Sequence, residues 1–229
     1  QNNLLSNITL PIGFSRSSGS VSDEDGKVLF YTNGRLILNN SHQIMPNGSE
    51  FNKSDWLDRY WTNPKGGFPY FQDLLILDDF SNNQGFYLIH KAPRYYIDSN
   101  DSTEIRISYV DMKLDNGLGD VVFKNQYFYE SQNLLVSYLT AIRHENQRDW
   151  WILQPILGTK IKTFLIDDSG INIMPDQDAN HRFTAEKSSA SGTARFSPDG
   201  RQYAIYNETD NLLIYDFDRA TGTLTFKKK

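Results

Sequence analysis

Three observations predict an all-β fold, a β-propeller of four-stranded antiparallel blades. Short apolar strands alternate with polar turns, no long segment has clean helical periodicity, and one strand pattern recurs along the chain. Of the 229 residues, 14% are aromatic, which favours the pleated, half-buried surfaces of sheets. The repeat predicts about four blades, which form either a complete ring or part of a larger, seven-bladed one.

The first part of the repeat is a polar turn followed by an apolar strand. This strand is expected at residues 28–31, 86–89, 150–153 and 203–206. Gly26, Gly85 and Gly200 occupy three of the preceding turns, and glycine supplies the left-handed backbone that a tight hairpin needs. The turns recur at roughly 50 to 60 residues, close to the period of known propeller blades.

The second part of the repeat is an apolar strand that ends in Asp or Asn. Its copies are expected at 36–39, 108–111, 164–167 and 213–216. Further strands are expected on either side of these two parts, as at 74–77, 138–142, 121–123 and 224–226. Each unit therefore holds about four strands. The units are expected to span roughly 12–50, 68–128, 133–178 and 188–229.

A blade of this kind cannot bury both of its faces alone, so neighbouring blades are expected to stack around an axis. The alternative is a β-sandwich with a similar number of strands, which does not require the repeat. Residues 1–229 are expected to form a single propeller domain or the N-terminal part of one. The start at Gln1 fits a processed export signal or a trimmed end, and the strand pattern running up to Lys229 fits a longer polypeptide.

The composition argues against several functional classes. A net charge of −5 argues against a nucleic-acid partner, because binding to phosphates requires a basic surface. The absence of cysteine removes disulfides, thiolate nucleophiles and cysteine-ligated metals. The apolar runs are too short to span a bilayer, so no membrane insertion is expected. The sequence has no P-loop and no dinucleotide-binding fingerprint, and we expect no cofactor.

Three stretches carry a resemblance to a known family. They lie at 22–34 with 45–48, at 141–151, and at 196–200 with 215–222. They read SDEDGKVLFYTNG with MPNG, AIRHENQRDWW, and FSPDG with YDFDRATG. On these stretches the chain resembles secreted Bacteroidetes proteins with WD-repeat-like β-propellers, which are often carried on cargo of the type IX secretion system.

The resemblance implies export through the periplasm, and a secreted protein or one on the outer-membrane surface. It implies a binding or scaffold role and brings no catalytic residues. The proteins of this group usually have more blades than the four units expected in these 229 residues, and a C-terminal sorting domain. The partner that the resemblance implies is the secretion machinery. Other chains that complete the ring are expected if the chain exposes an unpaired blade face, because large bare apolar patches rarely persist.

An aromatic insertion at residues 51–71 interrupts the repeat. Aromatic rings beside polar groups can stack on sugars or anchor a protein partner, and long insertions in rigid scaffolds often carry function. The alternative is that these rings cap a blade edge or plug the central channel. The candidate ligand-binding residues are Trp56, Tyr60, Trp61, Phe68 and Tyr70.

A polar hairpin turn contains His144, Asp149 and Trp150. We expect these residues to fix the rim of a blade, although a His and an Asp at this spacing can in principle act as a general acid and base. No metal site is expected, because the four histidines lack the HExxH pattern and the acidic turns at 23–25 and 167–168 lack the EF-hand pattern.

No catalytic residues are predicted, so the function indicated is a secreted or cell-surface propeller that binds a protein or a glycan without catalysis. One alternative is a propeller-type glycoside hydrolase, which needs paired carboxylates. The turn from Ser22 to Gly26 approaches the sialidase pattern but has Glu24 where Asp is expected. A second alternative is a type IX secretion cargo whose propeller only displays or spaces other domains.

Overall fold

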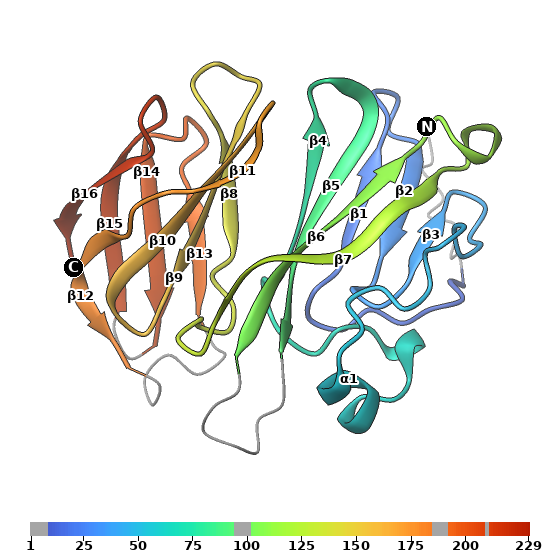
Figure 1. Ribbon diagram of the computed structural model, residues 1–229, viewed down its shortest axis with the longest axis horizontal. Coiled ribbons are helices and arrows are strands. Elements are labelled where there is room, and N and C mark those ends of the chain that lie inside the picture. The colour runs from blue at the N-terminus through green and yellow to red at the C-terminus, as the bar shows by residue number, and fades with distance from the viewer. Residues whose placement is uncertain (1–8, 94–101, 185–191, 209–210) are drawn as a thin grey trace, which may run out of the picture.

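The computed structural model describes residues 9–93, 102–184, 192–208 and 211–229. Its strands form four antiparallel sheets, which follow one another along the chain as the blades of a β-propeller (Figure 1). The predicted all-β propeller fold is therefore confirmed. In Figure 1 the second and third sheets lie toward the viewer, with the first sheet behind on the right and the fourth behind on the left.

Within each sheet the strands are hydrogen-bonded in chain order, with one exception. The first sheet has β1 (Gly19–Ser22), β2 (Val28–Thr32) and β3 (Ile37–Asn39). The second has β4 (Leu74–Asp79), β5 (Asn82–Pro93), β6 (Thr103–Asp111) and β7 (Asp120–Ser131). The third has β8 (Thr140–Arg143), β9 (Trp150–Pro155), β10 (Gly158–Asp167) and β11 (Gly170–Ile173), and β12 (Gln177–Phe183) pairs with β10. The fourth has β13 (Thr193–Phe196), β14 (Gln202–Asn207), β15 (Asn211–Asp218) and β16 (Thr223–Lys228).

The strand count differs from the expected four in two sheets. The first sheet has three strands and the third has five. After β3 the Asn39 side chain accepts hydrogen bonds from the backbone N–H groups of Ser41 and Gln43, which turns the chain away from an extended course. His42 and Asn47 then take left-handed backbone conformations that a regular strand does not tolerate. This polar segment therefore forms turns in place of a fourth strand.

The core consists of clusters that lie between neighbouring sheets. One cluster joins the first and second sheets, a second joins the second and third, and a third joins the third and fourth. In β14 and β15 the buried and exposed positions alternate, so Tyr203, Ile205 and Tyr215 face the third sheet. A smaller cluster belongs to the first sheet and the segment before it. In the described residues none of the four clusters combines the first sheet with the fourth.

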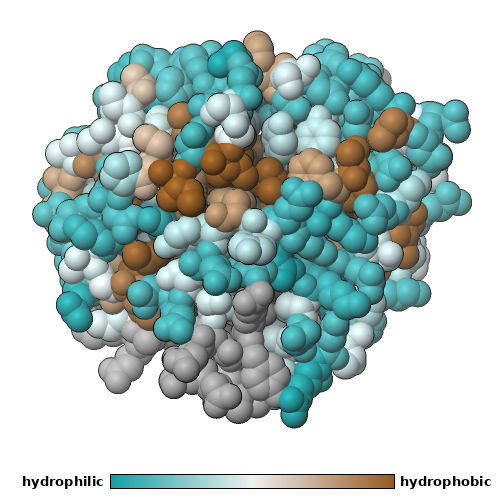
Figure 2. Space-filling view, in the orientation of Figure 1, coloured by the Kyte–Doolittle hydropathy of each residue, from teal (hydrophilic) through white to brown (hydrophobic). Residues whose placement is uncertain are grey.

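Apolar side chains also gather on the surface where the second and third sheets meet. Figure 2 shows them as a band across the middle of the face that it draws. Several members of the cluster between these sheets are only partly buried, among them Phe123, Phe128, Trp150 and Ile171. The stacking of the two sheets thus leaves part of their apolar contact region open to solvent.

The aromatic insertion lies between the first and second sheets and contains the only α-helix in the described residues, α1 (Asp55–Tyr60), followed by the 3-10 turn η1 (Pro64–Gly66). The Ser54 side chain accepts a hydrogen bond from the Leu57 N–H and caps the helix. Another 3-10 turn, η2 (Asp115–Gly117), joins β6 to β7. No helix in the described part of the chain is long and apolar enough to cross a membrane.

Candidate functional site

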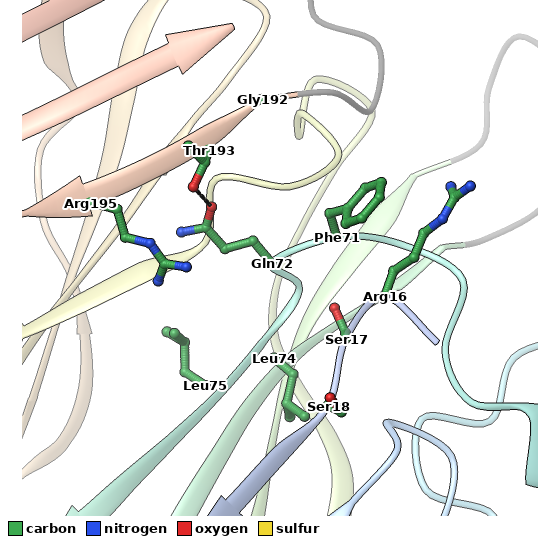
Figure 3. A pocket seen from close by; sticks show the side chains of 10 residues that line it. All are labelled: Arg16, Ser17, Ser18, Phe71, Gln72, Leu74, Leu75, Gly192, Thr193 and Arg195. Carbon is green, nitrogen blue, oxygen red and sulfur yellow. Dashed lines mark hydrogen bonds between the residues drawn. The ribbon is translucent and has the colours of Figure 1, made fainter. Parts of the chain in front are cut away.

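A pocket of about 590 Å³ lies where the leading segments of three sheets come together (Figure 3). We call it the axial pocket, because β1, β4 and β13 are the first strands of their sheets and such strands surround the centre of a propeller. Its lining residues come from before β1, from before and within β4, and from before and within β13. They are Arg16, Ser17, Ser18, Phe71, Gln72, Leu74, Leu75, Gly192, Thr193 and Arg195.

Gln72 connects the second sheet to the fourth across this pocket. Its Nε2 donates to the Ala194 carbonyl oxygen at 2.5 Å, and its Oε1 accepts from the Ala194 N–H at 3.0 Å. The Thr193 hydroxyl donates to the same Oε1 at 2.8 Å (Figure 3). The Gln72 amide thus pairs with the backbone of β13 as a neighbouring strand would.

The backbone of Gln72 is held in an unusual conformation. Its φ is 46°, in the left-handed region that side chains other than glycine and asparagine seldom occupy. Such a conformation persists only where the surroundings fix it, and it is common at functional sites. Here the bonds to Thr193 and Ala194 are among the contacts that hold it.

The base of the pocket is tied to a buried ion pair. The Ser17 hydroxyl donates to the Tyr70 carbonyl oxygen and accepts from the Asp73 N–H, which joins the segment before β1 to the segment before β4. Asp73 in turn pairs with Lys91 at 2.6 Å, with both side chains 4% exposed or less. Lys91 also donates to the carbonyl oxygens of Leu135 and Ser137, so all three of its protons have acceptors.

The charges of this pair follow from its burial. Burial raises the pKa of Asp73 and lowers that of Lys91, and the attraction between the two opposes both shifts. The Ser137 N–H also donates to the Asp73 carboxylate. Because Lys91 Nζ has three acceptors within the protein and Asp73 Oδ1 has two donors, we assign the pair a structural role between the second and third sheets.

The axial pocket contains no carboxylate among its lining residues. Hydrolysis of a glycosidic bond by the usual route needs two carboxyl groups, one of them protonated. A second pocket, beside the β15–β16 turn, does contain carboxylates, including Asp199 and Asp218. The Ser197 hydroxyl lowers the pKa of Asp199, and the Ala220 N–H lowers that of Asp218. The lowered pKa values of Asp199 and Asp218 are the reverse of what a general acid requires of these two carboxyl groups.

The five predicted ligand-binding aromatics are brought together only in part. Trp56 lies 5.8 Å from Tyr60 and 5.4 Å from Tyr70, measured between ring centroids. Tyr60 is 47% exposed and Trp61 is 39% exposed, and the Trp61 indole donates to the Gly67 carbonyl oxygen. Phe68 is 1% exposed and packs in the interior, so its ring is not available to a ligand.

The hairpin residues contact neighbouring sheets. The His144 ring bonds the Ala220 carbonyl oxygen of the fourth sheet at 3.0 Å and stacks on Trp151. The Trp150 indole donates to the Asp78 carbonyl oxygen of the second sheet. Asp149 is engaged by Asn146 and Arg148 within the turn. These contacts favour the structural interpretation of the hairpin over an acid and base pair. No group of three or more metal-ligating side chains lies together in the described residues.

The axial pocket has no signature in the sequence. Arg16, Gln72 and Arg195 lie in three separate parts of the chain, and none belongs to a recognisable motif. The one signal available was an arginine in the expected first strand of the last unit, within Thr-Ala-Arg-Phe at 193–196. A charged residue in an inner strand must face either the channel or a partner, because burying it alone is costly.

No protein-family model matches this chain. No curated protein matches it either. Among solved structures, it is similar to a periplasmic gluconolactonase of Pseudomonas aeruginosa, with 13% sequence identity, a TM-score of 0.47, and coverage of 91% of this chain and 52% of that one. It is also similar to the β-propeller domain of Cps50 (Swd1) from Myceliophteria thermophila, with 14% identity, a TM-score of 0.34, and coverage of 86% and 56%. The chain thus spans about half the length of each of these structures, and its own strand pairing defines its fold as a β-propeller.

Proposed function

We propose that this chain is a non-catalytic binding module whose propeller presents the axial pocket to a glycan or protein ligand. The observation that carries the proposal is the construction of the pocket. Three sheets contribute residues to the pocket, and the hydrogen bonds from the Gln72 side chain to β13, which we call the Gln72 clamp, fix its shape. Its lining has the donors and apolar surface of a binding site but no carboxylate. A glycoside hydrolase has no acid and base pair to use there.

A blocking substitution tests this proposal. Ser18 is exposed and lines the pocket, so Ser18→Trp places an indole in the space that a ligand needs. Ser20→Trp is the matched control, because Ser20 is also exposed and lies two residues along but does not line the axial pocket. Both variants and the parent chain are applied to an oligosaccharide library and assayed for turnover as well as binding.

The expected result is saturable binding without turnover, which Ser18→Trp abolishes and Ser20→Trp retains. Turnover that a single Asp or Glu substitution abolishes would instead identify a hydrolase. Saturable binding that Ser18→Trp leaves unchanged would place the ligand elsewhere, with the exposed rings of Tyr60 and Trp61 as the next candidates. An absence of any saturable ligand would support a propeller that only spaces other domains.

We also propose that the protein acts outside the cell, either secreted or on the outer-membrane surface as type IX secretion cargo. The support is the resemblance to exported Bacteroidetes propellers of the stretches at 22–34 with 45–48, at 141–151, and at 196–200 with 215–222. Protease treatment of intact cells tests this proposal. Degradation of the protein while a cytoplasmic marker survives is the expected result, and protection of both would contradict it.

A further inference from the structure

The axial pocket has a positive charge that the lining does not neutralise. Arg16 and Arg195 line it and no Asp or Glu does, although the whole chain carries a net charge of −5. Arg195 is exposed, and its side chain makes no hydrogen bond or ion pair with another residue of the described ranges. An arginine without an acidic partner in a pocket attracts an anion.

The arginines are held by ordered neighbours. Arg195 belongs to β13, whose backbone is fixed one residue earlier by the Gln72 clamp. Figure 3 shows its guanidinium pointing inward from β13, with Arg16 on the other side of Gln72. The Arg16 guanidinium lies 4.7 Å from the centre of the Phe71 ring. Stacking of this kind leaves the N–H groups at the edge of the guanidinium free to donate.

Most of the neutral polar groups in the pocket are already occupied. Both amide atoms of Gln72 are bonded to β13, and the Thr193 hydroxyl donates to Gln72. The Ser17 hydroxyl bonds Tyr70 and Asp73. The side-chain donors that remain for a ligand are the two guanidinium groups, the Ser18 hydroxyl and the second N–H of the Gln72 amide, so the charged donors predominate. This set favours an anionic acceptor over a neutral polyol.

The rest of the lining selects among anions. Phe71 is 43% exposed, and Leu74 and Leu75 also border the space. An inorganic anion would leave these apolar surfaces unused, whereas the C–H face of a sugar ring covers them. The volume of about 590 Å³ is suited to a small organic molecule.

We propose that the axial pocket binds a carboxylate-bearing sugar, with the carboxylate on Arg195 and the sugar ring against Phe71. Arginine suits a carboxylate because its planar fork can donate two parallel hydrogen bonds. Arg16 adds positive potential and supports the Phe71 ring from its other side. The inference rests on the proposed function and narrows its ligand to an acidic glycan.

Three probes separate the contributions to binding. D-glucuronate and D-glucose share a ring and differ in the carboxylate, while inorganic phosphate supplies the charge alone. Backbone amide shifts of Gly192, Thr193 and Ala194 in NMR titrations report on the pocket directly. We expect D-glucuronate to shift these amides saturably, with D-glucose and phosphate each at least about tenfold weaker, since a charged hydrogen bond contributes about 1.5–3 kcal/mol.

Variants of Arg195 and Arg16 test which guanidinium group binds the carboxylate. Arg195→Gln removes the proposed anchor and should weaken D-glucuronate binding about tenfold or more. Arg201→Gln is the matched control, because Arg201 is an exposed arginine in the turn that leads into β14 of the same sheet and does not line the axial pocket. It should leave binding unchanged. Arg16→Gln should give a smaller loss than Arg195→Gln.

The outcomes distinguish this inference from the proposed function. Equal binding of D-glucose and D-glucuronate, unaffected by Arg195→Gln, would overturn the acidic ligand but leave a glycan-binding pocket in place. Equal losses in Arg195→Gln and Arg201→Gln would show a general charge effect and would also overturn the inference. If none of the three probes shifts the pocket amides, the inference fails, and the oligosaccharide library with Ser18→Trp then decides the proposed function separately.

Discussion

The side chain of Gln72 and the backbone of Ala194 form a pair of hydrogen bonds between residues 122 positions apart in the chain. Gln72 belongs to the segment that leads into the second sheet, and Ala194 lies in the first strand of the fourth. These two sheets are not neighbours in the stacking order, because the third lies between them. The pair therefore adds a contact across the centre that the face-to-face stacking of blades does not supply.

Replacing Gln72 with Ala should lower the free energy of unfolding by about 1–3 kcal/mol, because the buried N–H and C=O of Ala194 lose their partners. Urea denaturation followed by tryptophan fluorescence measures the loss. Gln147→Ala is a matched control. Gln147 also has a left-handed φ, of 61°, but it is exposed and its side chain donates only to the Glu145 carbonyl oxygen of its own turn. Equal losses in the two variants would mean that backbone conformation, not the clamp, sets the cost.

The buried pair of Asp73 and Lys91 predicts large single-mutant effects. Lys91→Met or Asp73→Asn removes one partner and leaves the other's hydrogen-bonding groups unmatched in the interior, which should cost about 3–5 kcal/mol. The double variant should cost less than the sum of the two, because neither unpaired charge remains. Denaturant titration of all three variants checks this prediction.

The exposed pair of Lys53 and Glu50 provides the comparison for that experiment. It has a similar distance, 2.7 Å, but its side chains are 52% and 61% exposed. Lys53→Met should therefore change stability by no more than about 1 kcal/mol. If Lys91→Met and Lys53→Met have similar effects, the buried pair does not hold the second and third sheets together.

His90 predicts a dependence of stability on pH. Burial, and to a lesser extent the positive charge of Arg106, lowers the pKa of His90 well below its usual value of 6.5. The folded state therefore keeps the ring neutral, while the unfolded state takes up a proton as the pH falls below about 6.5. The contribution of His90 to the free energy of unfolding is therefore fully present above about pH 6.5. It decreases as the pH falls toward the pKa of the folded state, by up to about 1.4 kcal/mol per pH unit.

A His90→Gln variant isolates this contribution. Glutamine keeps polar atoms near Asn52 and Ser108, which the His90 ring bonds at 3.0 Å each, but it does not titrate. Unfolding free energies of both proteins are measured in urea at pH 7.5, 6.5 and 5.5. The parent should lose more stability than the variant between pH 6.5 and 5.5. Parallel pH profiles would show that His90 does not cause the loss.

The strands could be predicted because their signals are local. The expected strand at 203–206 is part of β14, Gln202–Asn207, and the expected strand at 164–167 ends β10. In both cases a polar turn and an apolar run lie within ten residues of each other. The short first sheet could not be predicted in this way, because an expected fourth strand was replaced by turns that depend on Asn39 and on left-handed residues beyond it.

The axial pocket could not be predicted because its signals are not local. Gln72 follows Phe71 in a segment without regular structure, and nothing in its neighbourhood indicates a partner in the fourth sheet. The burial of individual rings in the aromatic insertion could not be predicted either. Phe68 and Tyr60 are both aromatic residues of the same insertion, yet one is 1% and the other 47% exposed. Which ring enters the interior is decided by the packing of the first sheet against the insertion.

Gly34 lies against both Phe68 of the aromatic insertion and Ser17 of the axial pocket. Its φ is 81°, and a Cβ built on it would lie 2.5 Å from the Phe68 Cβ and 3.0 Å from the Ser17 carbonyl oxygen. Gly26 has the same φ of 81°, but a Cβ there meets nothing within 4 Å. Gly26→Ala should therefore cost only the left-handed conformation, about 1–2 kcal/mol. Gly34→Ala should cost about 1–3 kcal/mol more, because Phe68 is buried and must move.

The displacement of Phe68 in Gly34→Ala should also change the structure of the axial pocket. Ser17 and Phe68 form a β-bridge, and the Arg16 N–H donates to the Phe68 carbonyl oxygen, so a displaced Phe68 shifts the segment that carries Arg16. Amide NMR shifts of Arg16 and Ser17 should change in Gly34→Ala and remain unchanged in Gly26→Ala. If the two variants unfold at the same denaturant concentration and have the same amide shifts at Arg16 and Ser17, the contact between Gly34 and Phe68 does not position the pocket.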